Sequence, residues 1–277
     1  MLRKLKALLV VVRPMQAYKV GIVWLPALFH GPGSLRMNIK PLALASLAWW
    51  LASSVVYILN DLKDAQKDQL RPERSHRPIA NGELLTWEAV SLAGLLLAAL
   101  IGVIHLLPMH LGLLIGTYGI LNFLYTLGLK ESLGTRQAII AAGFWLRLQS
   151  GALPVVAIPL TPWASLFTLG LAYFLNCLKG LVAFHEDHHR GNRFAMGMGT
   201  GLAGSLALTS LVAICLKRGI DGTMTLPELP PLLCLLGMHR TALASFRKDF
   251  DKEQAHGIFL DPVTLAAMLA FILLFLY

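Results

Sequence analysis

Residues 60–82 read NDLKDAQKDQLRPERSHRPIANG, a charged stretch between two apolar runs that are each long enough to cross a bilayer. If the stretch begins as a helix, Asp61, Asp64 and Asp68 fall at positions i, i+3 and i+7, directly after Asn60. Side chains at this spacing share one face of a helix. The sequence therefore predicts a compact acidic face at the edge of a membrane.

Three carboxylates on one helix face repel one another unless a cation neutralises them. Mg²⁺ is the expected cation because it combines a few carboxylates with phosphate oxygens and water. We expect Asp61, Asp64 and Asp68 to be catalytic by holding Mg²⁺ together with Asn60, and the substrate to be phosphorylated. The donors for its remaining phosphate oxygens would come from the same stretch, which contains Lys63, Lys67, Arg71, Arg74, His76 and Arg77. A solvated loop of mixed charge is the plainer alternative.

The composition is that of an integral membrane protein. Of 277 residues, 56% are hydrophobic and 14% are charged, and the mean hydropathy is +0.64. The net charge of +9 is spread over short loops and forms no single stripe with aromatic residues, so no nucleic acid is expected as a partner. Arg13 and Pro14 interrupt the first apolar run, which favours a retained amphipathic segment over a signal peptide. We expect residues 1–277 to form one transmembrane domain.

Nine apolar segments have about the length of a membrane-spanning helix. They cover residues 17–30, 41–59, 86–106, 109–129, 137–158, 163–184, 195–216, 227–245 and 261–277. A membrane β-barrel would alternate apolar and polar residues, whereas these segments are apolar all round. The sequence therefore predicts an all-α bundle of about nine transmembrane helices.

The basic residues predict the orientation of this bundle. An N-terminus in the cytoplasm leaves only four basic residues in the outer loops, namely Arg36, Lys40, Lys217 and Arg218. We therefore expect a multi-pass protein of the inner (cytoplasmic) membrane with its active site facing the cytoplasm.

Further polar residues fall at the predicted cytoplasmic ends of the helices. They are Gln16 and Lys19 beside Arg13, Tyr125 and Lys130 beside Asn122, Lys179, and Glu186 and Asp187 within the run HEDHH. A second contact with Mg²⁺ and diphosphate through Glu186 or Asp187 is more plausible than a zinc or iron site, because the run offers a single i, i+4 histidine pair. Arg147 lies about three turns inside an apolar segment and must face an anion or a carboxylate within the bundle.

These features together resemble the UbiA superfamily of intramembrane transferases, whose NDxxDxxxD motif matches Asn60 to Asp68. Within it, the chain is most similar to the decaprenyl-phosphate phosphoribosyltransferase branch. The matching pieces are Arg13-Pro14 with Gln16 and Lys19, Arg71-Pro72 through Arg77-Pro78-Ile79-Ala80 with Gly82, Asn122 with Tyr125, Leu129-Lys130, Leu146-Arg147 with Gly151-Ala152, Pro162-Trp163, Lys179 and Leu260-Asp261. The resemblance implies a nine-helix fold in which acidic motifs hold Mg²⁺ and a diphosphate.

Two positions depart from that branch. Arg136 stands where an Asp is usual, and Gly180 with Leu181 stands where a basic pair is usual. Either Glu186 and Asp187 supply the second metal contact, or a single metal-binding motif remains.

The resemblance implies that phosphoribosyl diphosphate is the donor and that a polyprenyl phosphate, a membrane lipid, is the acceptor. Arg74, Arg77, Tyr125 and Lys130 would contact phosphates, and Arg147, Lys19 or Lys179 would draw in the lipid phosphate. The alternative is a prenyltransferase acting on a prenyl diphosphate and an aromatic acceptor. A third candidate, a lipid carrier without chemistry, lacks the internal repeats typical of transporters. The oligomeric state, a homo-oligomer included, stays open.

Overall fold

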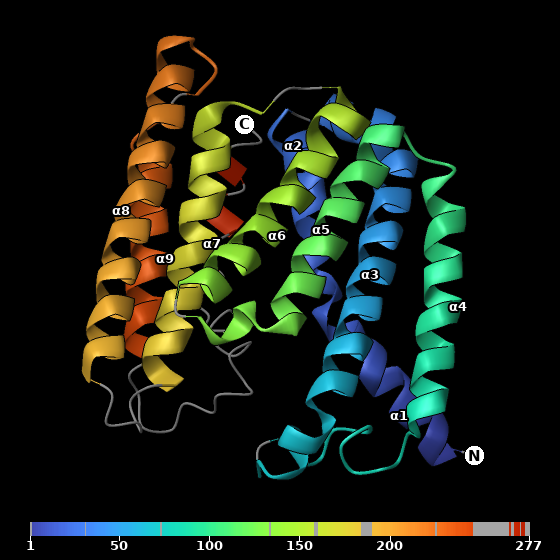
Figure 1. Ribbon diagram of the computed structural model, residues 1–277. Helices are drawn as coiled ribbons and strands as arrows, with labels where there is room; N and C mark the ends of the chain where they lie inside the picture. Colours follow the sequence, from blue (N-terminus) through green and yellow to red (C-terminus); the bar gives the residue numbers. More distant parts are fainter. Residues whose placement is uncertain are drawn as a thin grey trace. The chain divides into compact units, whose positions relative to one another are not determined.

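All regular elements of the described chain are helices (Figure 1). The computed structural model describes residues 2–30, 32–72, 74–132, 134–157, 160–183, 190–224 and 226–245, together with 266, 269–271, 273 and 274. The predicted all-α fold is therefore confirmed for this part of the chain. In order, the elements are α1 (Leu2–Val12), the 3₁₀ helix η1 (Pro14–Trp24), α2 (Leu25–Phe29), α3 (Pro32–Gln69), α4 (Thr86–Ile104), α5 (Met109–Leu127), η2 (Leu129–Glu131), α6 (Thr135–Gly151), the π-helical turn η3 (Ala152–Val156), α7 (Pro162–Ala183), α8 (Arg190–Ile220) and α9 (Leu229–Ser245).

Six helical stretches of the described residues are long and apolar enough to cross a membrane. They are Lys4–Phe29, Gly33–Gln69, Thr86–Ile104, Met109–Leu127, Pro162–Leu181 and Phe194–Ile220. The prediction of a multi-pass membrane protein is confirmed, although nine spans were expected. Helices α6 and α9 have 17 residues each, which gives about 26 Å against the roughly 30 Å of hydrocarbon. The ninth expected span, residues 261–277, falls largely outside the described residues.

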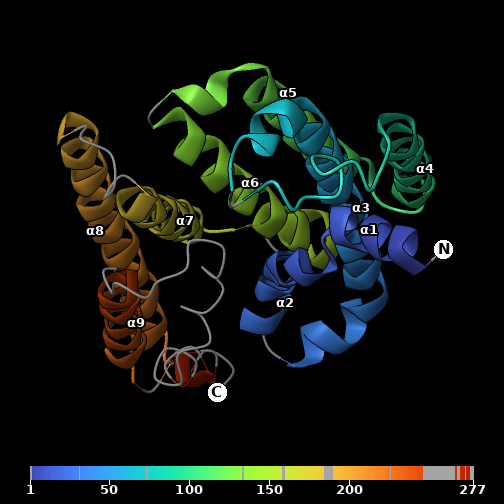
Figure 2. The same cartoon turned by 90° about the horizontal axis from the view of Figure 1, so that it is seen from below.

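The chain divides into two compact units. The first comprises Met1–Pro26, Arg36–Lys130 and Leu146–Ile158, and the second comprises Ala27–Leu35, Glu131–Trp145 and Pro159–Tyr277. Within the first unit, α3 runs between α4 and α5 in both views (Figures 1 and 2). Its 38 residues extend over about 57 Å, so the helix is longer than the hydrocarbon layer is thick. The acidic residues occupy its C-terminal end.

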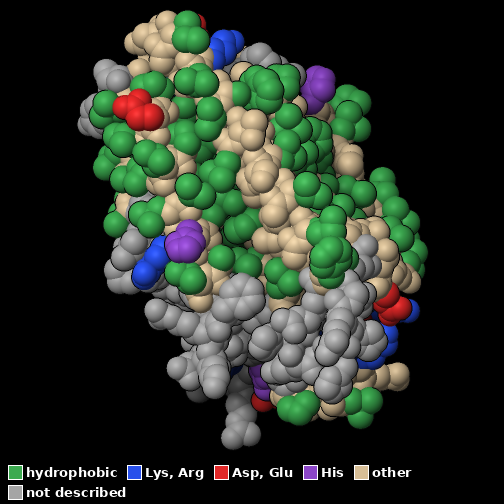
Figure 3. Space-filling model, turned by 90° about the vertical axis from the view of Figure 1, so that its left-hand side faces the viewer, with side chains coloured by type: hydrophobic (Ala, Val, Ile, Leu, Met, Phe, Trp, Pro, Cys, Tyr) green, Lys and Arg blue, Asp and Glu red, His purple; other side chains and the backbone are tan. Residues whose placement is uncertain are grey.

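In the second unit, α7, α8 and α9 pack through a cluster of Phe174, Leu178, Ala203 and Met238. The packing of α7 against α8 is close, since a Cβ on Gly170 would lie 2.9 Å from the carbonyl oxygen of Ala203. The face of the molecule in Figure 3 shows mostly hydrophobic side chains and few charged ones among the described residues. Such a surface suits contact with lipid chains.

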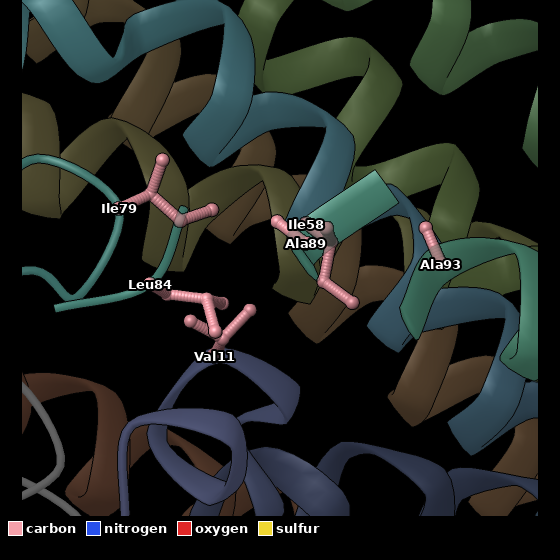
Figure 4. Packing of buried hydrophobic residues seen from close by; sticks show 6 residues of the cluster. All are labelled: Val11, Ile58, Ile79, Leu84, Ala89 and Ala93. Atoms are coloured by element: carbon pink, nitrogen blue, oxygen red, sulfur yellow. The ribbon is translucent and has the colours of Figure 1, made fainter. Parts of the chain in front are cut away.

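The segment between α3 and α4 is fixed to the first unit by a hydrophobic cluster (Figure 4). Ile79 and Leu84 from this segment are buried in the cluster, and the other buried members are Val11, Ile58, Ala89 and Ala93. Two hydrogen bonds support this conformation: Gln69 Nε2 donates to the carbonyl of Ala80 at 2.9 Å, and Leu84 N donates to the carbonyl of Pro78 at 2.9 Å. The segment that contains Arg74 and Arg77 is thereby held in place against α3.

We predict that Leu84→Ala destabilises the protein by about 2 to 4 kcal/mol, because the truncation leaves a cavity in this cluster. Leu84 is 2% exposed, whereas Leu70 in the same segment is 86% exposed. Leu70→Ala is therefore the matched control and should leave the protein's stability almost unchanged. Thermal unfolding in detergent and limited proteolysis between α3 and α4 measure the effect. Equal stability of the two variants would contradict the proposed anchoring.

Candidate functional site

One inclined row of side chains on α3 organises the polar contacts of the first unit. The row comprises Trp49, Ser53, Tyr57, Asp61, Asp64 and Asp68, at successive spacings of four, four, four, three and four residues. At 100° per residue these side chains stay within about a third of the helix circumference. Each of them contacts a cationic side chain from another segment. We call this set the polar row.

At the acidic end of the polar row, Arg77 joins two buried aspartates. Its Nη1 lies 3.0 Å from Asp61 Oδ1 and 2.8 Å from Asp68 Oδ2. Asp61 and Asp68 are 5% and 1% exposed, so each needs a compensating positive charge. Arg74 adds a longer contact, 3.7 Å from its Nη1 to Asp68 Oδ1. Arg74 and Arg77, both in the segment after α3, therefore supply positive charge to Asp61 and Asp68.

Asp64, the middle aspartate, contacts the short helix η2 that follows α5. Lys130 Nζ lies 2.5 Å from Asp64 Oδ1, and Asp64 lies about 60° around the helix from Asp61. Asn60 shares this direction, since its Oδ1 accepts a hydrogen bond from Thr126 of α5. Tyr125, the residue before Thr126, is half-buried on the same helix. The structure thus brings Asn60, Asp64 and Lys130 together.

Arg13 also contacts the polar row, although the sequence analysis assigned it no partner. Its Nη2 lies 2.6 and 2.9 Å from the two carboxylate oxygens of Asp61, and its guanidinium lies 4.9 Å from the ring centroid of Tyr57. The backbone of Arg13 adopts φ 53° and ψ 57°, a conformation uncommon for residues with a Cβ. The Arg13-Pro14 pair inside an apolar run was the available signal.

Gln16 and Lys19 belong to η1 and face one another. Lys19 Nζ donates to Gln16 Oε1 at 2.9 Å, and it lies 5.9 Å from the ring centroid of Tyr57. In a 3₁₀ helix, residues three apart are eclipsed, so this conformation aligns the two side chains. Lys19 and Arg13 therefore share the ring of Tyr57 on the polar row.

Arg147 of α6 contacts the polar row at Trp49 and Ser53, both of which are buried. The residue is 5% exposed, and its Nη2 donates to Ser53 Oγ at 2.7 Å. Its guanidinium lies 4.8 Å from the ring centroid of Trp49 and 4.7 Å from that of Tyr118. Cation–π contacts of this kind stabilise a guanidinium that has left water. The expectation that Arg147 faces the bundle interior agrees with this burial.

No contact described above involves the remaining expected site residues. Arg71 is exposed at the start of the segment after α3. Lys179 is exposed on α7 in the second unit. Arg136, which departs from the phosphoribosyltransferase pattern, is exposed at the start of α6. Glu186 and Asp187 lie outside the described residues.

Among the described residues, no three carboxylate, imidazole or thiolate groups converge as a ready metal site. The aspartates are instead neutralised by Arg13, Arg77 and Lys130. Asp68 Oδ1 is nevertheless buried and has no hydrogen-bond donor. Carboxylate and amide oxygens are the ligands that Mg²⁺ accepts. The oxygen atoms of Asn60 and the three aspartates are therefore suitable ligands for Mg²⁺, provided that the cations give up their contacts with the carboxylates.

Comparisons with known proteins give a family match and several relatives for this chain. The model of the UbiA prenyltransferase family matches residues 20–256. A decaprenyl-phosphate phosphoribosyltransferase of Mycolicibacterium smegmatis is 31% identical over 61% of this chain and 49% of its own length. The protein of the same name from Mycobacterium tuberculosis is 27% identical over 65% of this chain and 61% of its own length. The matched stretch thus spans roughly half to three fifths of these relatives.

A solved structure supports the same fold. It is described as a UbiA homolog from Archaeoglobus fulgidus bound to DMAPP and Mg²⁺, and it covers 97% of this chain and 98% of its own with a TM-score of 0.71. At 14% sequence identity, this likeness bears on the fold alone.

We predict that Arg77→Gln destabilises the protein by about 3 kcal/mol in metal-free buffer, because it leaves two buried carboxylates without their shared cation. Mg²⁺ should restore part of the lost stability, since it can take the place of the removed charge. Thermal unfolding with and without Mg²⁺ measures both effects. Lys63→Gln removes an exposed charge from α3 and should change neither value. Loss of stability in Arg77→Gln that Mg²⁺ leaves unaltered would argue against a metal site here.

Proposed function

The chain belongs to the UbiA prenyltransferase family, and from this premise we propose that it transfers 5-phosphoribosyl from phosphoribosyl diphosphate to a polyprenyl phosphate. The observation that carries the proposal is the excess of cations along the polar row. Six cationic side chains accompany its three carboxylates, namely Arg13, Lys19, Arg74, Arg77, Lys130 and Arg147.

This excess favours the more anionic pair of substrates. Phosphoribosyl diphosphate carries a diphosphate and a separate 5-phosphate, and the lipid acceptor carries a further phosphate. A prenyl diphosphate and an aromatic acid carry fewer anionic groups. Because partly buried charges are costly without a counter-charge, a surplus of cations favours substrates that carry several phosphates. The names of the curated relatives point to the same substrates.

Asn60, Asp61, Asp64 and Asp68 are the residues that would hold Mg²⁺. When bound, the ion would supply Lewis-acid stabilisation of the charge that develops on the leaving diphosphate. The cations that now contact these carboxylates would be released toward the donor. Arg77 and Lys130 are placed for this role, because each already lies within hydrogen-bond distance of an aspartate oxygen. Guanidinium and ammonium groups bind phosphate oxygens as readily as carboxylates.

The reaction needs little proton transfer by the protein. An oxygen of the lipid phosphate attacks C1 of the ribose, and the C1–O bond to diphosphate breaks with its electron pair leaving on the diphosphate. The protein's own contribution is to hold the two anionic substrates close together and to stabilise the departing charge. Arg74, Arg77, Tyr125 and Lys130 would contact the donor phosphates. We place this chemistry at the cytoplasmic face of the inner membrane, as the positive-inside bias indicates.

The proposed function is tested with purified protein, Mg²⁺, phosphoribosyl diphosphate and a radiolabelled polyprenyl phosphate. We expect a phosphoribosyl lipid and one equivalent of diphosphate. A parallel reaction receives a prenyl diphosphate and an aromatic acid. Product from the parallel reaction alone would replace the proposal with aromatic prenyl transfer.

We predict that Asp64→Asn lowers turnover at least 100-fold, because the loss of one carboxylate weakens the metal site while Lys130 retains an oxygen partner. Lipid binding should be retained, and its affinity is measured in the same preparation. Glu83, an exposed carboxylate in the segment after α3, provides the control, since Glu83→Gln should keep normal turnover. Normal turnover in Asp64→Asn would contradict the assigned role of this carboxylate.

A further inference from the structure

Helix α5 and the η2 turn after it present a set of polar side chains to α3, at intervals of four residues. The set consists of Tyr118, Asn122, Thr126 and Lys130. Its first and last members contact the polar row: the ring of Tyr118 lies 5.1 Å from that of Trp49, between centroids, and Lys130 forms an ion pair with Asp64. The register of α5 against α3 is therefore fixed on both sides of Thr126.

The hydroxyl of Thr126 lies within hydrogen-bond distance of two oxygens. One is Asn60 Oδ1 of α3, and the other is the backbone carbonyl oxygen of Asn122, at 2.8 Å. A hydroxyl carries one hydrogen and two lone pairs, so it can donate fully to one of these oxygens at a time. When it donates to Asn60, it meets the amide as a donor. When it donates to the carbonyl of Asn122, it meets the amide as an acceptor.

The side chain of Asn60 can satisfy the hydroxyl in either case. Its amide group has an oxygen acceptor on one side and an NH₂ donor of similar size on the other, and turning the group over exchanges them. With Thr126 as the donor, Oδ1 is held by the hydroxyl, as in the structure. With Thr126 as the acceptor, Nδ2 takes that place and Oδ1 is directed away from Thr126. The exchange therefore leaves the hydroxyl hydrogen-bonded throughout.

The direction of this amide matters for the proposed metal site. Asn60 precedes Asp64 by four residues on α3, so their side chains are neighbours on the helix surface. Mg²⁺ takes oxygen ligands, so Asn60 can bind it through Oδ1 and not through Nδ2. We propose that Thr126 is a positioning residue for Asn60: its hydroxyl holds the amide and permits Oδ1 to be released to Mg²⁺. The inference rests on the proposed function, which assigns Asn60 to the ion.

A plainer role for the same hydrogen bond is to join α5 to α3. The two roles place different demands on residue 60. A bond that joins the helices needs an acceptor there, and a carboxylate would serve as well as an amide. A bond that positions a ligand matters because the two ends of an amide differ. Asn60→Asp removes that difference, since a carboxylate offers an oxygen whichever way it turns.

The test measures the Mg²⁺ concentration that gives half of the thermal stabilisation of the full chain, at a fixed concentration of diphosphate. Thr126→Val keeps the shape of the side chain and removes the hydroxyl, and it should raise this concentration at least tenfold. Thr126→Ser keeps the hydroxyl and should bind Mg²⁺ normally. Thr117→Val is the matched control, because Thr117 is exposed on the same helix and its hydroxyl also donates to the carbonyl four residues earlier, at 2.9 Å.

The same substitution is then made in the Asn60→Asp protein. There, Thr126→Val should change the Mg²⁺ concentration by less than about threefold, because the carboxylate needs no orientation. An equal loss of Mg²⁺ affinity with Asn and with Asp at position 60 would overturn the inference, since the hydroxyl would then join the helices. Normal Mg²⁺ binding in Thr126→Val would overturn it as well. The unfolding temperature without ligands shows whether each variant is folded, and Thr126→Ala gives the same comparison if the valine variant is not.

These outcomes separate the inference from the proposed function. If the unchanged protein forms the phosphoribosyl lipid while Thr126→Val binds Mg²⁺ normally, the role of Thr126 is wrong and the reaction stands. If Thr126→Val loses Mg²⁺ affinity in the presence of Asn60 alone, and the unchanged protein transfers a prenyl group instead, the reaction is wrong and the role of Thr126 stands. If Mg²⁺ with diphosphate does not stabilise the unchanged protein, the metal site and the inference are both wrong.

Discussion

Two carboxylates that are buried on the same helix require a positive charge between them, and this requirement governs the first unit. Asp61 and Asp68 share Arg77, which reaches both from the segment after α3. That segment in turn must be held in place, and the burial of Ile79 and Leu84 achieves this. The hydrophobic cluster thus positions the cations, and the cations permit the aspartates to stay buried. Packing and electrostatics are coupled at this end of α3.

No three metal ligands converge in the part of the chain that the structure describes, and the same coupling would allow the proposed site to accept a divalent ion. Bound Mg²⁺ would compete with Arg13, Arg77 and Lys130 for the aspartate oxygens, so the ion alone gains little by displacing them. A diphosphate changes the balance, because it offers new oxygen partners to the displaced cations. We therefore regard the metal and the anionic donor as ligands that favour one another's binding. On the proposed function, the ion pairs within the protein would hold the site in shape before the donor binds.

Sequence reasoning predicted much of this arrangement and missed its tertiary contacts. The lengths of the apolar runs predicted the helical membrane fold, and the spacing of the aspartates predicted their register on α3. The pairing of Arg13 with Asp61 joins residues 48 positions apart, which no local pattern reveals. The 3₁₀ conformation of Pro14–Trp24 was also missed, because an apolar run is equally typical of an α-helix. Helix α6 ends at Gly151, inside the apolar run 137–158, so hydropathy does not mark this boundary, whereas the run 227–245 predicted α9 to within two residues.

The most direct test of this account is the thermal stability of the unchanged protein with Mg²⁺ alone, with diphosphate alone and with both. If the carboxylates exchange their cations for a metal while the cations take up the diphosphate, each ligand alone will stabilise the protein slightly. Together they will then raise the unfolding temperature by clearly more than the sum of the separate shifts. Separate shifts that simply add would contradict the exchange on which this account of the site depends.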